Sequence, residues 1–170
     1  MLMRYGCLGC LLFSSSLLAQ QQLDVMVGKP TTSQNIDISH ADTRLYFPVG
    51  SLFGSSCDWG FTGRAGILNA GNDSGARVGS EGFASCQLGE RWTWTMPLGM
   101  LWLSRYQFES DNGKTKDYGG PWQFVAAMSL SYRFTDHWLV GYEWSHMSNW
   151  YQYEKNPALN SHNLMLSYRF

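Results

Sequence analysis

The stretch that decides the fold is the C-terminal pair of alternating segments, Trp138–Ser148 (WLVGYEWSHMS) and Asn160–Phe170 (NSHNLMLSYRF). In the first segment most even positions carry large apolar side chains, whereas the odd positions include Glu143 and Ser145. Side chains at i and i+2 of a strand point to the same face, so this alternation predicts a β-strand with one apolar and one polar side. The polar connection at 149–159 predicts that the two strands form an antiparallel hairpin.

The same period of two recurs along the rest of the chain and predicts about eight strands in all. Aromatic residues make up 15% of the chain, yet the mean hydropathy is slightly polar, at −0.25. This combination is typical of outer-membrane barrels, in which apolar and polar residues alternate. We therefore predict an all-β protein, an eight-stranded antiparallel transmembrane β-barrel. Its other strands are expected at Leu23–Lys29, Ile36–Val49, Cys57–Asn69, Ala76–Gly89, Trp92–Ser104 and Trp122–Phe134.

The polar faces of these strands carry charges of both signs, which can pair inside a closed barrel. The interior of an eight-stranded barrel is filled by side chains and leaves no open channel. A soluble, lipocalin-like barrel would have to bury the aromatic face, which holds too many large side chains for such a core. The predicted interior charges are Asp42, Arg44, Arg64, Arg77, Glu81, Arg133, Glu143 and Arg169.

The N-terminus has the layout of a secretory signal peptide, residues 1–19, in which Arg4 precedes the short apolar run Cys7–Leu18. A lipoprotein signal at Cys10 is a weaker alternative, because the apolar run follows that cysteine. The barrel domain is then expected at 20–170, in the outer membrane of a Gram-negative bacterium. The formal net charge of −1 gives no electrostatic support for nucleic-acid binding.

Two cysteines, Cys57 and Cys86, lie almost symmetrically about the expected turn Gly71–Gly75. If the flanking strands pair across that turn, the two thiols come nearly opposite each other in an oxidising compartment. A disulfide and two separate buried thiols are equally open from the sequence.

Parity also places a polar cluster on the lipid-facing wall. His146 and Ser148 end the apolar face of one strand, and Asn160 has the same parity at the start of the next. A histidine beside a serine is the arrangement of a general base and a nucleophile, with Asn160 placed to orient the imidazole. Asn149 and Asn156 in the loop are candidate amide donors to an oxyanion. The alternative interpretation is an ordinary polar rim beside the aromatic girdle.

The segments His146–Asn149 and Asn156–Asn160, followed by an aromatic-ended strand, resemble the active-site hairpin of the PagL-type lipid A 3-O-deacylases. These are eight-stranded outer-membrane acyl hydrolases of Gram-negative bacteria. The resemblance implies hydrolysis of the 3-position ester of lipid A at the outer leaflet, with release of a 3-hydroxy fatty acid. It implies that Ser148 attacks, that His146 acts as base, and that the two loop asparagines help to hold the oxyanion.

One position departs from that family. The best-known triad has glutamate as its third member, whereas the aligned residue here is Asn160. An amide can orient a histidine but cannot stabilise the imidazolium by its charge. Glu154, in the same loop, is the alternative orienter, whereas Glu143 has inward parity.

The sequence also bears on alternative functions, on cofactors and partners, and on the remaining histidines. A non-catalytic structural or adhesive barrel is the alternative function, and a lipid A palmitoyltransferase would need its catalytic residues inside the barrel. No residues have zinc-site spacing and no phosphate-binding glycine loop occurs, so neither metal nor cofactor is expected. The expected partner is lipopolysaccharide, and the sequence leaves a homodimer open. We expect His40 inside the barrel, His137 in a short turn, and His162 facing lipid headgroups beside Asn160.

Overall fold

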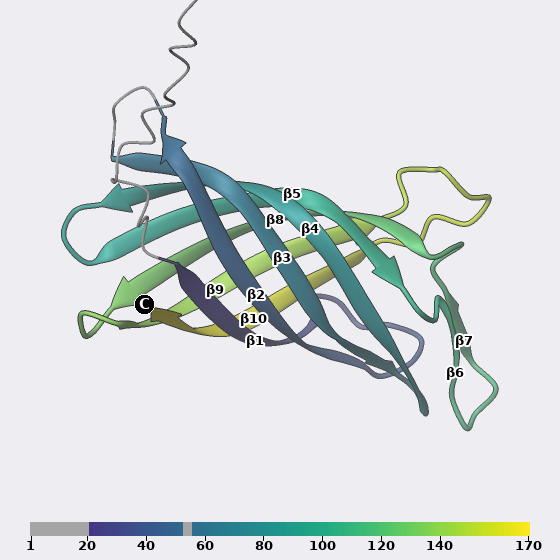
Figure 1. The fold of residues 1–170 in the computed structure, drawn as a ribbon. Helices are drawn as coiled ribbons and strands as arrows, with labels where there is room; N and C mark the ends of the chain where they lie inside the picture. Colours follow the sequence, from purple (N-terminus) through teal and green to yellow (C-terminus); the bar gives the residue numbers. More distant parts are fainter. Residues whose placement is uncertain (1–20, 53–55) are drawn as a thin grey trace, which may run out of the picture.

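The computed structural model describes residues 21–52 and 56–170, which form a closed barrel of eight antiparallel strands (Figure 1). Strand β1 pairs with β10 and so closes the barrel. This confirms the predicted fold class, while the predicted signal peptide at 1–19 lies outside the described residues. The barrel strands are β1 (Gln22–Pro30), β2 (Ile38–Ser51), β3 (Cys57–Ala70), β4 (Asp73–Leu88), β5 (Trp92–Leu103), β8 (Trp122–Arg133), β9 (Trp138–Ser148) and β10 (Leu159–Arg169).

The strand bounds agree with the alternation to within a few residues, with one difference at the outer turn between β3 and β4. Strands β3 and β4 stay paired up to Ala70 and Asp73, which leaves a connection of two residues, Gly71 and Asn72. Gly71 takes a φ of 62°, a conformation that glycine adopts without steric cost. The predicted turn Gly71–Gly75 is therefore shortened.

Among the described residues, no helix is long and apolar enough to cross a membrane.

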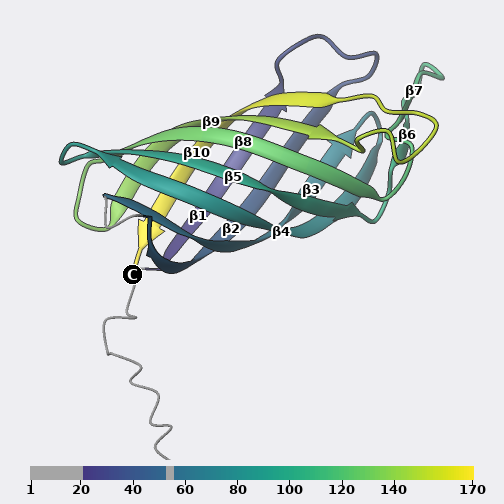
Figure 2. The same ribbon diagram turned by 90° about the horizontal axis from the view of Figure 1, so that it is seen from above.

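The long connection between β5 and β8 contains a small hairpin that alternation did not predict. It consists of β6 (Gln107–Glu109) and β7 (Thr115–Asp117), which pair only with each other. Strands of three residues are too short to show a period of two. The hairpin lies at the end of the barrel opposite the C-terminus (Figure 2).

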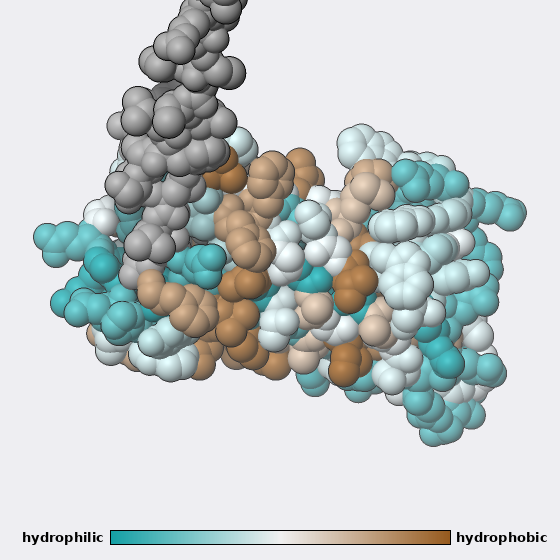
Figure 3. All heavy atoms as spheres, in the orientation of Figure 1, coloured by the Kyte–Doolittle hydropathy of each residue, from teal (hydrophilic) through white to brown (hydrophobic). Residues whose placement is uncertain are grey.

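Side-chain exposure follows the predicted parity. Apolar residues with outward parity, such as Leu98 and Leu164, are 62% and 68% exposed. Apolar side chains gather over the middle of the wall, and hydrophilic ones gather at the two ends (Figure 3). The wall is therefore the lipid-facing surface that a transmembrane barrel requires.

The barrel interior contains a network of paired charges. Arg44 bridges two carboxylates, with N–O distances of 2.7 Å to Glu81 and 2.6 Å to Glu143. Arg64 lies 3.2 Å from Glu81 and 2.8 Å from Asp42, which Arg77 also contacts. Asp42, Glu81 and Glu143 thus each have at least one guanidinium partner, which is the condition for burying such charges. The inward parity predicted for Glu143 is confirmed.

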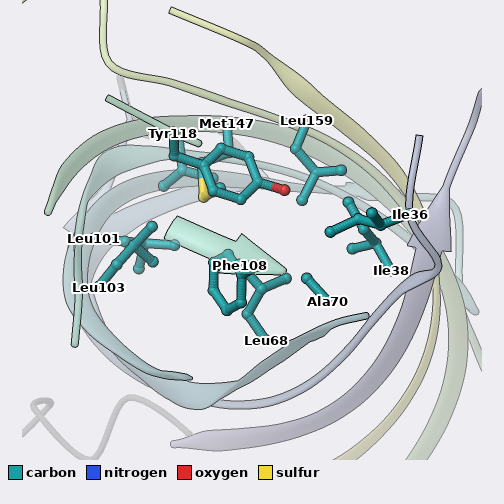
Figure 4. Close-up of a cluster of buried hydrophobic side chains, with 11 residues drawn as sticks. Ile36, Ile38, Leu68, Ala70, Leu101, Leu103, Phe108, Tyr118, Met147 and Leu159 are labelled. Carbon is teal, nitrogen blue, oxygen red and sulfur yellow. The ribbon is translucent and has the colours of Figure 1, made fainter. Parts of the chain in front are cut away.

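A second, apolar cluster fills the outer end of the barrel (Figure 4). Phe108 and Tyr118 reach it from the β6–β7 hairpin and the residue that follows it, and they are 2% and 0% exposed. Met147 and Leu159 enter the cluster from the facing ends of β9 and β10. The outer loops are thereby packed onto the same side chains that hold the end of the C-terminal hairpin. The other members are Ile36, Ile38, Leu68, Ala70, Leu101, Leu103 and Val125.

The sequence left two states open for the cysteines, and the structure contains the disulfide. Cys57 and Cys86 are register partners in β3 and β4, with Cα atoms 3.9 Å apart. The bond ties the two strands together at the end opposite the outer loops.

Candidate active site

The three predicted side chains meet on the outer wall. Asn160 is the direct register partner of His146 across β10 and β9, and Ser148 lies two residues farther along β9. His146 Nδ1 is 2.7 Å from Asn160 Oδ1, and His146 Nε2 is 3.2 Å from Ser148 Oγ. All three side chains are half-buried. The imidazole thus bridges the amide and the hydroxyl, as the parity predicted.

The Asn160 contact determines the tautomer of the imidazole. An amide oxygen only accepts hydrogen bonds, so His146 Nδ1 must carry the proton that it donates to Asn160 Oδ1. In the neutral ring Nε2 is then unprotonated and faces the Ser148 hydroxyl. This is the arrangement that a general base requires in order to accept the proton of a nucleophilic hydroxyl.

The surroundings hold the imidazole on one side and leave space on the other. The Trp144 ring stacks beside His146, with centroids 6.5 Å apart and an interplanar angle of 24°. On the β8 side, the register partner of His146 is the small residue Ala126. Trp144 and Ala126 also line an apolar groove of about 480 Å³ that runs across β8, β5, β4 and β3. The wall next to His146 therefore carries an apolar groove.

The end of β9 is anchored from inside. Met147 lies between His146 and Ser148 in sequence, has the opposite parity, and is 3% exposed in the apolar cluster. Ser148 has Phe124 as its register partner, and Phe124 in turn packs edge-on against Trp150 at 5.3 Å between centroids. The two polar side chains thus stand on a strand end that is packed on its opposite face.

The loop after Ser148 contains two consecutive residues in the left-handed region, Trp150 with φ 49° and Tyr151 with φ 59°. This conformation costs of the order of 1 kcal/mol or more for each residue other than glycine, so other contacts must hold it. The backbone N–H of Gln152 donates to the carbonyl of Asn149 at 3.0 Å, which closes the turn.

Asn149 has a different position from the one expected for an oxyanion donor. Its side chain is fully buried, and Nδ2 donates to the carbonyls of Tyr118 and Lys155, at 2.9 and 2.5 Å. Both donor hydrogens of the amide are therefore used to join the loop to the segment after β7. The parity rule explains this, because 149 has the inward parity of Met147. The expectation that the Asn149 side chain donates to an oxyanion is corrected here.

Asn156 retains a free donor. Its Oδ1 accepts the backbone N–H of Asn149 at 3.0 Å, and no hydrogen bond involves its Nδ2 in the described part of the chain. Glu154, the alternative orienter, is exposed and makes no hydrogen bond with His146 among the described residues. The geometry favours Asn160 in that position, because the contact to Asn160 already occupies His146 Nδ1.

An ion pair joins the same loop to the β6–β7 hairpin. Lys155 Nζ lies 2.9 Å from Asp117 Oδ2, and Asp117 Oδ1 accepts the backbone N–H of Gly119 at 2.8 Å. Partial burial opposes ionisation, but the contacts with Lys155 and Gly119 hold the pKa of Asp117 below its ordinary value. Gly119 has φ +83°, and a Cβ there would lie 2.1 Å from the Lys155 carbonyl oxygen. No sequence pattern predicts the ion pair, because Asp117 and Lys155 are 38 residues apart.

The remaining histidines lie where parity placed them. His40 is buried beside Asp42, His137 stacks on Tyr168 in a turn, and His162 is exposed on the outer wall. Within residues 21–52 and 56–170, no three His, Cys, Asp or Glu side chains come together as metal ligands would.

Comparison with solved structures relates the fold to small outer-membrane barrels. The structure titled "Crystal structure of the outer membrane enzyme PagL" matches with a TM-score of 0.63 and 13% identity, covering 86% of this chain and 97% of that one. The N-terminal β-barrel domain of Pseudomonas aeruginosa OprF matches with a TM-score of 0.61 and 8% identity, over 89% and 97% of the chains. The Yersinia pestis protein Ail in a nanodisc matches with a TM-score of 0.52 and 10% identity, over 89% and 99%. No curated protein sequence matches the chain.

The fold and its apolar outer wall define a small outer-membrane β-barrel. The sequence itself is more specific, since residues 39–169 match the family described as Lipid A 3-O-deacylase (PagL). The chain belongs to this family of outer-membrane lipid A deacylases.

Proposed function

We propose that this protein is a serine esterase that hydrolyses the ester at the 3-position of lipid A and releases a 3-hydroxy fatty acid. The observation that carries the proposal is the hydrogen-bonded series Asn160–His146–Ser148 on the outer wall. The lipid A ester lies in the outer leaflet, so a site on the wall reaches it without any channel through the barrel. A general base and nucleophile in contact are the minimal machinery for ester hydrolysis.

The reaction proceeds in two halves. Ser148 Oγ attacks the ester carbonyl as His146 Nε2 takes its proton, and the sugar 3-hydroxyl leaves with that proton. Water then attacks the acyl-serine, again with His146 as base, and releases the fatty acid with Ser148 restored. Asn156 Nδ2 is the side-chain donor that we assign to the oxyanion, because its hydrogens are not used elsewhere in the described residues. Asn149 positions the loop that carries it.

Asn160 supplies orientation without charge. Its Oδ1 holds the imidazole in the tautomer that leaves Nε2 free, which is the first task of the third triad member. The second task, electrostatic stabilisation of the imidazolium, is absent with an amide. We therefore assign Asn160 as the orienter in place of the family's glutamate and expect a lower rate than a carboxylate would give.

Mass spectrometry of lipid A tests the function directly. Cells that express the wild-type protein should lose one 3-hydroxyacyl chain from lipid A, and cells that express Ser148→Ala should not. An unchanged spectrum with wild type would favour the alternative, a non-catalytic structural or adhesive barrel. A gain of a palmitoyl chain would contradict both. The possible homodimer stays a prediction, and the mass of the protein in detergent measures it.

A further inference from the structure

In the described barrel strands, one residue with a formal charge faces outward. Within the described barrel strands, the position with outward parity that holds Asp, Glu, Lys or Arg is Lys29 in β1. Its side chain is exposed, and no salt bridge joins it to a carboxylate in residues 21–52 and 56–170. Every other charged residue of the described barrel strands has inward parity, whereas Lys29 faces outward one residue before the outer end of β1. A lysine near the end of a membrane-spanning segment reaches into the headgroup region, where an anion from outside can meet its charge.

Lys29 lies beside the proposed active site. Its register partner is His162 in β10, and the register partner of His162 on the other side is Trp144 in β9. Directly opposed side chains of neighbouring strands have Cβ atoms about 5 Å apart, so Lys29 and His162 are neighbours on the wall. Asn160 lies two residues from His162 on the same face. Lys29 is thus two strand spacings, roughly 10 Å, from the strand that bears Ser148.

His162 offers a second donor at the same place. Its Nδ1 is hydrogen-bonded to the hydroxyl of Tyr142, the outward neighbour of Trp144 along β9. When the Tyr142 hydroxyl donates to Nδ1, the proton of the neutral ring lies on Nε2. No other hydrogen bond involves His162 in the described part of the chain. In that tautomer the Nε2–H group is left to donate outward, beside the register partner Lys29.

An apolar groove of about 430 Å³ begins at these donors. Lys29, His162 and Tyr142 are among the residues that line it, and Val27, Ala41 and Leu164 contribute apolar side chains; the remaining lining residues are Gly28, Ser39, His40, Asn69 and Asn163. A cation and an N–H group at the head of an apolar groove match an amphiphile with an anionic headgroup. The two grooves come together at β9, where Tyr142 lines this one and Trp144 lines the one that extends over β8.

We propose that Lys29 and His162 bind a phosphate of the lipid A headgroup while an acyl chain of the same molecule lies in the adjoining groove. The proposal rests on the proposed function and names its specificity site. Lipid A carries phosphate monoesters on its glucosamine disaccharide, so a phosphate at Lys29 fixes the sugar relative to Ser148. The ester to be cleaved is thereby selected among the several esters of the substrate.

The test compares phosphorylated lipid A with chemically dephosphorylated lipid A in mixed micelles. Wild type should prefer the phosphorylated substrate in kcat/KM by roughly ten- to hundredfold, the range for a hydrogen bond to a charged group. Lys29→Ala should remove most of that preference, and Lys29→Arg should retain it. Lys114→Ala, an exposed lysine of the outer hairpin, is the matched control and should keep the wild-type preference. A Lys29→Ala variant that slows both substrates equally overturns the proposal.

Two further measurements, equilibrium binding and competition with inorganic phosphate, separate the role of Lys29 from the proposed function and from binding of a free anion. In a Ser148→Ala background, which needs no turnover, Lys29→Ala should weaken equilibrium binding of phosphorylated lipid A by the same factor. If Ser148→Ala still hydrolyses lipid A, the proposed function is wrong. The difference in binding between the variants with and without Lys29 still tests whether Lys29 binds the phosphate. Excess inorganic phosphate should leave the substrate preference intact. Loss of the preference would assign the site to a free anion and contradict the lipid assignment.

Discussion

His146 and Asn160 are paired directly across β9 and β10, and the 2.7 Å contact between Nδ1 and Oδ1 keeps Nε2 free for Ser148. The contact uses an amide in a position where the family's known triad has a carboxylate. The orientation of one side-chain amide therefore sets which nitrogen of His146, the proposed general base, carries the proton. With the amide reversed, Nδ2 would donate to Nδ1, and the imidazole would carry its proton on the side facing Ser148.

Substitution of Asn160 should separate orientation from charge. Asn160→Ala should lower kcat by roughly a hundredfold, because the imidazole loses its fixed tautomer. Asn160→Glu should match or exceed the wild-type rate, because a carboxylate both orients the ring and stabilises the imidazolium. Both rates are measured by release of 3-hydroxy fatty acid. Glu154→Gln is the control and should leave the rate unchanged; its inactivation would identify Glu154 as the third member instead.

Replacing both Ser148 and His146 should lower the rate of hydrolysis no further than replacing either one alone. Ser148→Ala and His146→Ala should each reduce hydrolysis to a low residual level, and the double variant should have the same residual rate. The reason is that the nucleophile and its base act as one unit. Single-turnover kinetics of the three variants make the comparison. Additive losses would show that the two side chains work independently, contrary to the proposed mechanism.

Activity should depend on the anchoring of the β9 end as much as on the polar side chains themselves. Met147→Ala removes a buried side chain from the apolar cluster and should destabilise the barrel by about 2–4 kcal/mol, with loss of activity. Met128→Ala, on the lipid-facing side of the neighbouring strand at 48% exposure, is the matched control and should cost far less. Urea unfolding in lipid vesicles measures both, and equal costs would contradict the anchoring role.

The Asp117–Lys155 pair should hold the active-site loop in a pH-dependent way. Because the pKa of Asp117 is lowered in the folded protein, its contribution is present above the ordinary value near 3.8 and is lost as the pH falls below it. The Gly119 N–H, which donates to Asp117, should therefore lose protection from hydrogen exchange in that acidic range.

The same contact can be removed at neutral pH. Asp117→Asn should expose the loop at Trp150 and Tyr151 to faster cleavage by chymotrypsin, because the charge that binds Lys155 is gone. Lys114→Ala in the same hairpin serves as control and should cleave like wild type. If Asp117→Asn and wild type are cleaved at the same rate, the ion pair does not hold the loop in position.

Alternation was sufficient to predict the barrel and the side of the wall on which each residue lies. It placed His146, Ser148 and Asn160 on the lipid-facing side, and it placed Arg44 and Glu143 inside, because strand side chains repeat every two residues. It did not predict β6 and β7, whose three-residue strands show no period. It also did not predict the buried position of the Asn149 amide, whose partners come from a distant loop.

The sequence by itself thus determined parity, and the tertiary structure decided register and loop contacts. A slip of two residues between β9 and β10 would keep every side chain on its face, yet it would move Asn160 away from His146. That register follows from packing in the apolar cluster, where Met147 and Leu159 are paired across the same two strands. Alternation with a period of two cannot distinguish registers that differ by two, so only the packed barrel brings the three side chains together.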